Sequence, residues 1–342
     1  MRIDWLTRKR TCVQVTAGAL FVLLLLLVGL VQLQLAPGNW KEDFYLEVAV
    51  LAYDRPASLR RLLASLEEAA YDNERITLHI CIDRPKAEDK LAGHREAVQV
   101  AERFQFTHGE KVLTVRPRNV GVTAQWLDCW NPDVSPGNYG LILEDDMRLS
   151  PYYYRWLKAA CITYGGYSDG GNIVLSRPRA ALPITQVWRD PLCTVCENLT
   201  AFLYRIPRLW AYAPMPNHWR QFRDWVLPLL SINLTTDSEF IPYVPDQNVV
   251  MNRWLTNGIL HGHVDIEFYM YYYQATRKTF SLYAYLPQNK SFACNHRELG
   301  VNVKPATFVG KCDSEPLTMW DDEYIRFPAN PVRLDLDGNP VD

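Results

Sequence analysis

The residues most able to do chemistry are Arg55, Asp83 and the triplet Glu144-Asp145-Asp146, each at or just after the end of a short apolar run. Adjacent carboxylates repel each other unless a positive charge relieves them. A hard divalent cation such as Mn²⁺ or Mg²⁺ does this, and phosphate oxygens commonly complete its coordination shell. The triplet therefore predicts a metal site, and a metal there would neutralise a diphosphate leaving group.

The competing interpretation of the triplet is an acidic turn open to solvent. Such a turn would lead into the next helix, which the sequence predicts to start with Ser150 as N-cap and Pro151 at the first helical position. The metal interpretation is favoured because the triplet follows an apolar run that is continuous rather than alternating, as expected for a strand buried on both faces.

Strands and helices alternate through the first half of the chain. Strand-like runs lie at 47–53, 76–82, 111–115 and 139–143, and Pro56 opens a helix after the first of them. This order predicts an α/β domain with a largely parallel sheet, in which ligands bind beyond the carboxyl ends of the strands. From about Asn172 the regular pattern is lost.

Three stretches resemble nucleotide-diphosphosugar transferases of the GT-A fold, in particular the N-acetylglucosaminyltransferase I group, glycosyltransferase family 13. They are VAVLAYDRPASLRRLLASL (48–66), ICID (80–83) and LILEDDMRLSPYYYRWL (141–157). The resemblance implies a Rossmann-like GT-A domain that uses a uridine nucleotide-sugar and Mn²⁺. It is clear over about 47–157 and faint beyond.

The resemblance also implies roles for individual donor-site residues. Arg55 would contact the nucleotide diphosphate, and Asp83 would hydrogen-bond the uracil or ribose. Asn119 begins a segment that would pass under the nucleotide. Glu144 and Asp145 would face the donor sugar and ribose.

The metal ligand implied by the resemblance is Asp146. GT-A enzymes often bring a late histidine to the metal, which makes His296, in the polar segment CNHRELGVN (294–302), a candidate second ligand. A structural histidine is the alternative. His261 and His263 are better explained by a solvated turn.

The family's general base lies in a Trp-flanked Asp-Trp segment, whose nearest match here is HWRQFRDWV (218–226). This would make Asp224 the base, although Arg223 departs from the family pattern. A surface helix with its tryptophans packed inwards explains the same residues, and Glu239 and Asp246 are other possible bases. Only a carboxylate within reach of the acceptor hydroxyl can serve.

The chain starts with features of a membrane anchor. Arg8, Lys9 and Arg10 precede an uncharged apolar stretch long enough to cross a bilayer, which predicts a cytosolic N-terminus and a lumenal body. A cleaved signal peptide is the alternative. We expect a cytosolic tail (1–12), a transmembrane signal-anchor (13–35), a short stem (36–44) and a lumenal transferase domain (45–342) with a nucleotide-sugar half (45–165) and an acceptor half (166–342).

Cysteines and sequons agree with a lumenal body. Seven of the eight cysteines follow the anchor, where disulfides form, and the odd number leaves at least one unpaired within the chain. Cys193 and Cys196 are better explained by disulfides than by zinc, because no second pair stands at zinc-ribbon spacing. Glycosylation sequons start at Asn198, Asn233 and Asn289.

Together these features predict a single-pass type II Golgi membrane glycosyltransferase. It would move a sugar, N-acetylglucosamine being one candidate, from a UDP-sugar to a glycan or glycoprotein, with inversion expected. The nearly equal counts of 36 Lys+Arg and 38 Asp+Glu argue against a nucleic-acid partner. The alternatives are a same-fold transferase with another donor or stereochemistry, a catalytically silent glycan-binding protein, and a metal-dependent phosphohydrolase.

Overall fold

The computed structural model describes residues 44–132, 137–178, 199–235, 238–245, 249–262, 264–299, 305, 310–336 and 338–341. These belong to one unit, Phe44–Asp342. The predicted anchor lies outside the described residues, as do Cys193, Cys196, Asn198, Asp246 and His263. Among the described helices, none combines the length and the apolar character needed to cross a bilayer.

The described elements alternate in the first half and become shorter and less regular later. The helices are α2 (Pro56–Glu67), α3 (Leu91–Arg103), α4 (Gly121–Asp128), α5 (Tyr153–Tyr164), α6 (Pro216–Leu229), α7 (Val249–Leu260) and α8 (Ile266–Arg277). The strands are β1 (Tyr45–Ala52), β2 (Ile76–Ile82), β3 (Gly109–Val115), β4 (Asn138–Glu144), β5 (Met147–Leu149), β6 (Gly170–Val174), β7 (Ala201–Tyr204), β8 (Tyr212–Pro214), β9 (Phe280–Ala284), β10 (Lys290–Ser291), β11 (Ala293–Asn295), β12 (Glu315–Pro316), β13 (Arg333–Leu334) and β14 (Pro340–Val341).

One mixed sheet carries the fold, with the strand order β14-β13-β7-β9-β6-β8-β4-β1-β2-β3. The half formed by β4, β1, β2 and β3 is entirely parallel, as predicted. The other half is mixed: β8 is antiparallel to both β4 and β6, whereas β6 and β9 are parallel. The prediction of an α/β fold with a mostly parallel sheet is therefore confirmed, and the parallel order belongs mainly to the first half.

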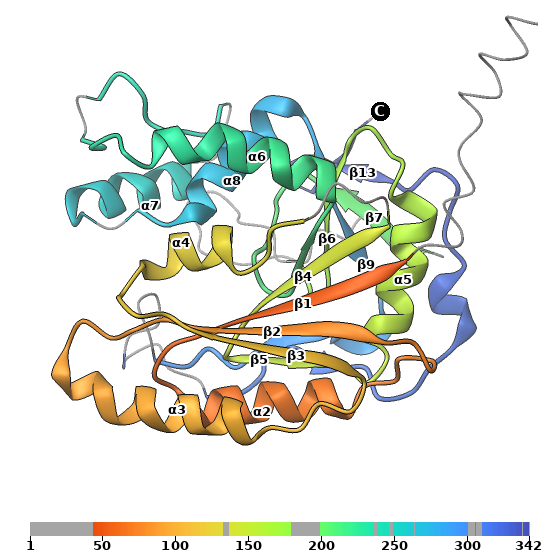
Figure 1. Ribbon diagram of the computed structural model, residues 1–342. Coiled ribbons are helices and arrows are strands. Elements are labelled where there is room, and N and C mark those ends of the chain that lie inside the picture. The colour runs from red at the N-terminus through yellow and green to blue at the C-terminus, as the bar shows by residue number, and fades with distance from the viewer. Residues whose placement is uncertain are drawn as a thin grey trace, which may run out of the picture. The chain divides into compact units, whose positions relative to one another are not determined.

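Helices cover both faces of the sheet, with α2 and α3 on one face and α4, α6 and α8 on the other (Figure 1). Strand β1 shows why, because successive side chains point to opposite faces. Val48 and Val50 pack with the core of α2, α3 and α5, whereas Ala49 and Leu51 pack with α4, α6 and α8. A strand buried on both faces has no polar side, which explains the continuous apolar runs.

Helix α2 forms where the sequence predicted it. Pro56 occupies the first turn, and the apolar stripe Leu59, Leu62, Leu63 and Leu66 is buried against the sheet. This burial fixes the start of α2 beside the end of β1, which places Arg55 at the edge of the sheet.

Gly140 in β4 lets the Trp130 ring pack flat on the strand. A Cβ at this position would lie 2.4 Å from Cδ2 and Cε2 of Trp130, which is buried. Gly140→Ala should therefore lower the free energy of unfolding by about 1–3 kcal/mol, measured by urea denaturation. Gly166→Ala is the control, since its Cβ would meet nothing within 4 Å. Equal stability of the two variants would contradict this packing.

Candidate active site at the carboxyl edge of the parallel strands

The acidic triplet lies at the carboxyl edge of the parallel half of the sheet. Strand β4 ends at Glu144, and the turn to β5 carries Asp145 and Asp146, which are only 2% and 6% exposed. Leu51 of β1 is paired in register with Glu144, so the residues after β1 reach the same edge. The interpretation of the triplet as a turn open to solvent is therefore wrong for the two aspartates.

Arg55 closes over this turn. Its Nη1 donates to Oδ2 of Asp146 at 3.1 Å, and its Nη2 forms an ion pair with Asp145. The structure thus brings together the arginine and the two aspartates that the sequence placed at separate strand ends. One guanidinium bridges two buried carboxylates and offsets the repulsion between their charges.

The triplet holds more negative charge than Arg55 neutralises. Burial and the charge of Asp146 raise the pKa of Glu144 to about 8. Burial also raises the pKa of Asp145 to about 7, against the lowering effect of Arg55. Three carboxylates facing one guanidinium are a donor set that fits a divalent cation bound through oxygen.

Asn295 is a member of the site that the sequence did not indicate. Its Nδ2 donates to Oδ1 of Asp146 at 2.8 Å, and its side chain is buried. Strand β11 places it there by pairing antiparallel with β5. The one signal in the sequence is its position next to His296, the candidate second metal ligand.

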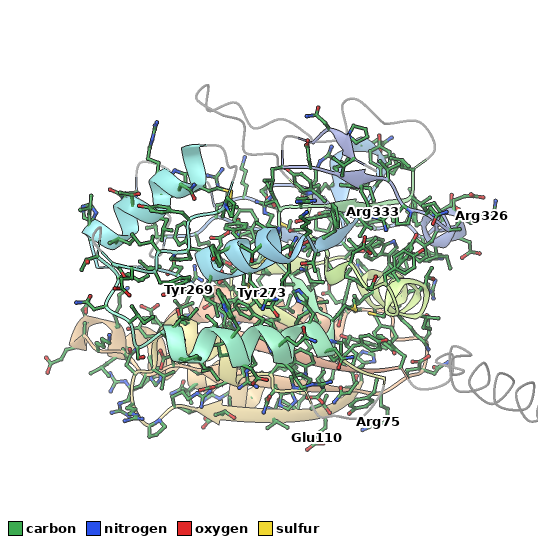
Figure 2. All side chains as sticks on the ribbon, turned by 90° about the horizontal axis from the view of Figure 1, so that it is seen from above. Arg75, Glu110, Tyr269, Tyr273, Arg326 and Arg333 are labelled. Carbon is green, nitrogen blue, oxygen red and sulfur yellow. A yellow bond between two sulfur atoms is a disulfide. The ribbon has the colours of Figure 1, made fainter. Side chains whose placement is uncertain are left out.

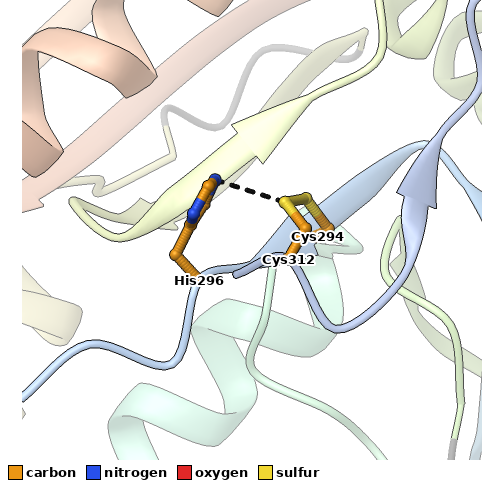
Figure 3. A group of neighbouring side chains, drawn as sticks. All are labelled: Cys294, His296 and Cys312. Carbon is orange, nitrogen blue, oxygen red and sulfur yellow. Dashed lines mark hydrogen bonds between the residues drawn. A yellow bond between two sulfur atoms is a disulfide. The ribbon is translucent and has the colours of Figure 1, made fainter. Parts of the chain in front are cut away.

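His296 reaches the triplet through its main chain, because its N–H donates to the carbonyl of Asp146 at 2.9 Å. Its Nε2 lies 3.2 Å from Sγ of Cys312, which forms a disulfide with Cys294 (Figure 3). Both sulfurs are therefore committed to each other rather than available as thiolate ligands. Burial and the charge of Arg61 lower the pKa of His296, which favours the neutral imidazole that a metal requires. Its coordination of a metal stays a prediction.

Asp83 and Asn119 meet at the start of α4. The Asp83 carboxylate accepts hydrogen bonds from Nδ2 of Asn119 at 3.1 Å, from the N–H of Val120 at 2.9 Å and from the N–H of Gly121 at 2.8 Å. Gly121 has a φ of 82°, a conformation that favours glycine. Asp83 thus holds the turn into α4, and its contact with a nucleotide stays a prediction.

Asp224 is exposed on α6, and no hydrogen bond or ion pair among the described residues joins it to the triplet. The same helix buries Trp219 and Phe222 against the sheet, so inward packing of its aromatic residues is confirmed. Tyr269 and Tyr273 of α8 lie between the two helices (Figure 2). The role of Asp224 as a base is not tested by this placement.

Two disulfides join described cysteines, Cys81 with Cys129 and Cys294 with Cys312, while Cys161 is buried and free. The predicted use of disulfides is therefore confirmed. The second bridge ties β11, which carries Asn295, to the segment that follows residue 310.

Comparisons with known proteins match the chain to one family model and show remote similarity to solved structures. The chain is similar to S. aureus TarS (residues 1–349), with 12% identity, a TM-score of 0.29 and coverage of 42% of this chain and 43% of that structure. It is also similar to mouse xyloside xylosyltransferase 1 in its apo form, with 10% identity, a TM-score of 0.31 and coverage of 70% and 84%. The chain therefore spans less than half of the TarS structure, and similarity of this degree carries no argument about activity.

No curated protein matches the sequence. The family model described as "SPBC1E8.03c C-terminal domain" matches residues 55–233. This stretch starts at Arg55, contains the whole triplet and makes up more than half of the 342 residues. The chain therefore belongs to the SPBC1E8.03c C-terminal domain family.

Proposed function

We propose that this protein is a metal-dependent glycosyltransferase that moves a sugar from a uridine nucleotide-sugar to a glycan or glycoprotein. The observation that supports this most is the triplet at the carboxyl edge of the parallel strands, with its two aspartates buried and its three carboxylates near the single guanidinium of Arg55. This edge is where α/β sheets bind their ligands. The surplus of negative charge suits a cation that bridges protein and diphosphate.

Asp146 would hold the metal, Mn²⁺ or Mg²⁺, with His296 as a second ligand. The metal would neutralise the charge that develops on the diphosphate as the glycosidic bond breaks. Asp146 is already oriented, because Asn295 and Arg55 donate to its two oxygens from different directions. A ligand held in this way needs little rearrangement to bind a cation.

Arg55 would turn from the aspartates to the diphosphate once a cation has taken over their charge. Glu144 and Asp145 would accept hydrogen bonds from the hydroxyls of the donor sugar and ribose, as charged carboxylates do well. Asp83 and Asn119 would support the nucleotide from the turn into α4. The predicted anchor at 13–35 would fix the enzyme in the Golgi membrane with this domain in the lumen.

The test is a screen of the purified full-length protein against uridine and other nucleotide-sugars, with Mn²⁺ or with a chelator. We expect one UDP-sugar, with UDP-N-acetylglucosamine as the first to try, to be bound and slowly hydrolysed only when the metal is present. A silent glycan-binding protein would bind glycan without hydrolysing any donor. A protein that binds no nucleotide-sugar with either metal would contradict the proposal.

A further inference from the structure

A second acidic residue lies on the same side of the sheet as Glu144. Side chains alternate along β4, so Glu144 shares the face of Ile142, and Trp126 of α4 donates to it through Nε1 at 3.3 Å. Helix α8 covers this face, since its residues Ile266 and Met270 pack in the same core as Ile142. Glu267 stands in the first turn of α8.

The topology places Glu267 at the carboxyl edge of the sheet, because α8 leads directly into the start of β9, which is parallel to β6. Arg208 lies at the same edge. Tyr212 of β8 is paired in register with Ile142 of β4 and with Val174 of β6, so the chain before Tyr212 lies at the end where β4 and β6 finish. Nη1 of Arg208 donates there to the carbonyl of Arg177, just beyond β6, at 2.7 Å. The charge of Arg208 acts on Glu267 and lowers the pKa of its carboxyl.

A continuous polar network joins Arg208 to the triplet. Nη2 of Arg208 lies 3.3 Å from Oδ2 of Asp313, and Oδ1 of Asp313 accepts from the N–H of Asn295 at 3.1 Å. Asn295 in turn donates to Asp146. Arg208 is therefore paired with Asp313, which leads through Asn295 to Asp146. The charge of Arg208 also acts on Glu267.

Glu144 accepts from Trp126, and Asp83 accepts from Asn119 and the turn into α4, whereas four other carboxylates at this edge are paired with positive charge. Asp145 and Asp146 face Arg55, Asp313 faces Arg208, and Glu298 faces Arg61. The hydrogen bond described for Glu267 comes instead from a neutral group, the hydroxyl of Tyr271, at 2.6 Å. The donor to Glu267 is therefore uncharged, while the charge of Arg208 still acts on the carboxylate.

We propose that Glu267 is the general base that accepts the proton of the acceptor hydroxyl, an inference that rests on the proposed transferase function. The acceptor oxygen forms a bond to the anomeric carbon of the donor sugar. The bond from that carbon to the diphosphate oxygen breaks, and its electron pair stays on the diphosphate. The proton of the hydroxyl passes to the carboxylate of Glu267, so charge and atoms balance.

The electrostatic setting supports this role. Burial raises the pKa of Glu267, with a further rise from Asp265, while the hydrogen bond from Tyr271 and the charge of Arg208 lower it. A base whose pKa lies closer to the working pH transfers protons more effectively. Asp224, the base implied by the family resemblance, is exposed on α6.

The test compares transfer to the acceptor with binding of UDP and Mn²⁺ in Glu267→Gln. The amide oxygen can still accept from Tyr271 but the side chain cannot take a proton, so we expect the transfer rate to fall about 10²-fold while nucleotide binding, measured by calorimetry, is unchanged. Glu74→Gln is the control for replacing a glutamate that is bonded to a tyrosine, and Glu74 is also ion-paired with Lys158. Glu74 also accepts from a tyrosine hydroxyl, that of Tyr154, but it precedes the start of β2 rather than following a strand end.

Tyr271→Phe gives a second measurement that does not depend on the folding of the first variant. Loss of its hydrogen bond should raise the pKa of Glu267, so the acidic limb of the pH–rate profile should move to higher pH. The other groups facing the pair, Asp265, Arg208 and Tyr283, are unchanged in this variant. Near-normal transfer in Glu267→Gln, or an unmoved profile in Tyr271→Phe, would overturn the assignment. A wild type that binds no nucleotide-sugar would overturn the proposed function itself.

Discussion

Asp146→Asn should slow sugar transfer by about 10²–10³-fold, the usual effect of removing one electrostatic contact with a transition state. The amide is a poor metal ligand, so the charge on the diphosphate leaving group would be less compensated. Both oxygens of Asp146 accept hydrogen bonds, from Arg55 and Asn295, and an amide can satisfy only one of these donors. We therefore also expect a loss of about 1–3 kcal/mol in the free energy of unfolding.

The measurement is the initial transfer rate against Mn²⁺ concentration, with circular dichroism to confirm that the variant is folded. Asp145→Asn is the control, because it stands one position earlier, has similar burial and is expected to contact a hydroxyl rather than the metal. Its rate should fall less, and its response to Mn²⁺ should stay normal. A folded Asp146→Asn protein with near-normal rate and metal response would remove the basis of the metal site.

The part of the site nearest the strand ends could be predicted from the sequence. Parallel strands end at one edge, so a pattern that identifies β1 and β4 also predicts that Arg55 and the triplet meet. The same reasoning brings Asp83 to that edge. It could not show that Asp83 uses both oxygens on the turn into α4, because that depends on the path of a loop.

The rest of the site comes from the second half, where local patterns say little. Asn295 reaches Asp146 across 149 positions of sequence, by means of a three-residue strand that has no periodic signal. The pairing of Cys294 with Cys312 and the approach of Arg208 to Asp313 depend on the same long-range packing. Residue types and spacing therefore favoured His296 and Asp224, whose roles stay predictions, and gave no signal for Asn295.

Arg55 should matter for stability as well as for binding. Arg55→Met keeps most of the length and the apolar part of the side chain but leaves Asp145 and Asp146 buried without their counter-charge. Removing one partner of a buried ion pair commonly costs about 3–5 kcal/mol. We expect the loss to approach this size only above about pH 7, when no metal is present, measured by urea denaturation.

The loss should depend on pH in a defined direction. Arg55 lowers the pKa of Asp145, so its removal raises that pKa further above the unfolded value. A carboxyl with a raised pKa in the folded state destabilises the protein as pH rises, because the folded state must lose a proton that it holds more tightly than the unfolded chain does. Relative to wild type, the extra loss from Asp145 should therefore be absent while both folded proteins hold its proton, and should grow as pH rises above about 7.

Arg60→Met is the matched control, because Arg60 stands on the exposed side of the same helix and its ion pair with Glu96 is solvated. Its loss should be at most about 1 kcal/mol, as for other surface pairs. Mn²⁺ should stabilise Arg55→Met more than wild type, since a divalent cation can replace the missing guanidinium between the aspartates. Arg55→Met could instead prove as stable as Arg60→Met at every pH and gain nothing from Mn²⁺. Asp145 and Asp146 would then need no cation in the folded protein, and the argument for a metal at this edge of the sheet would fail.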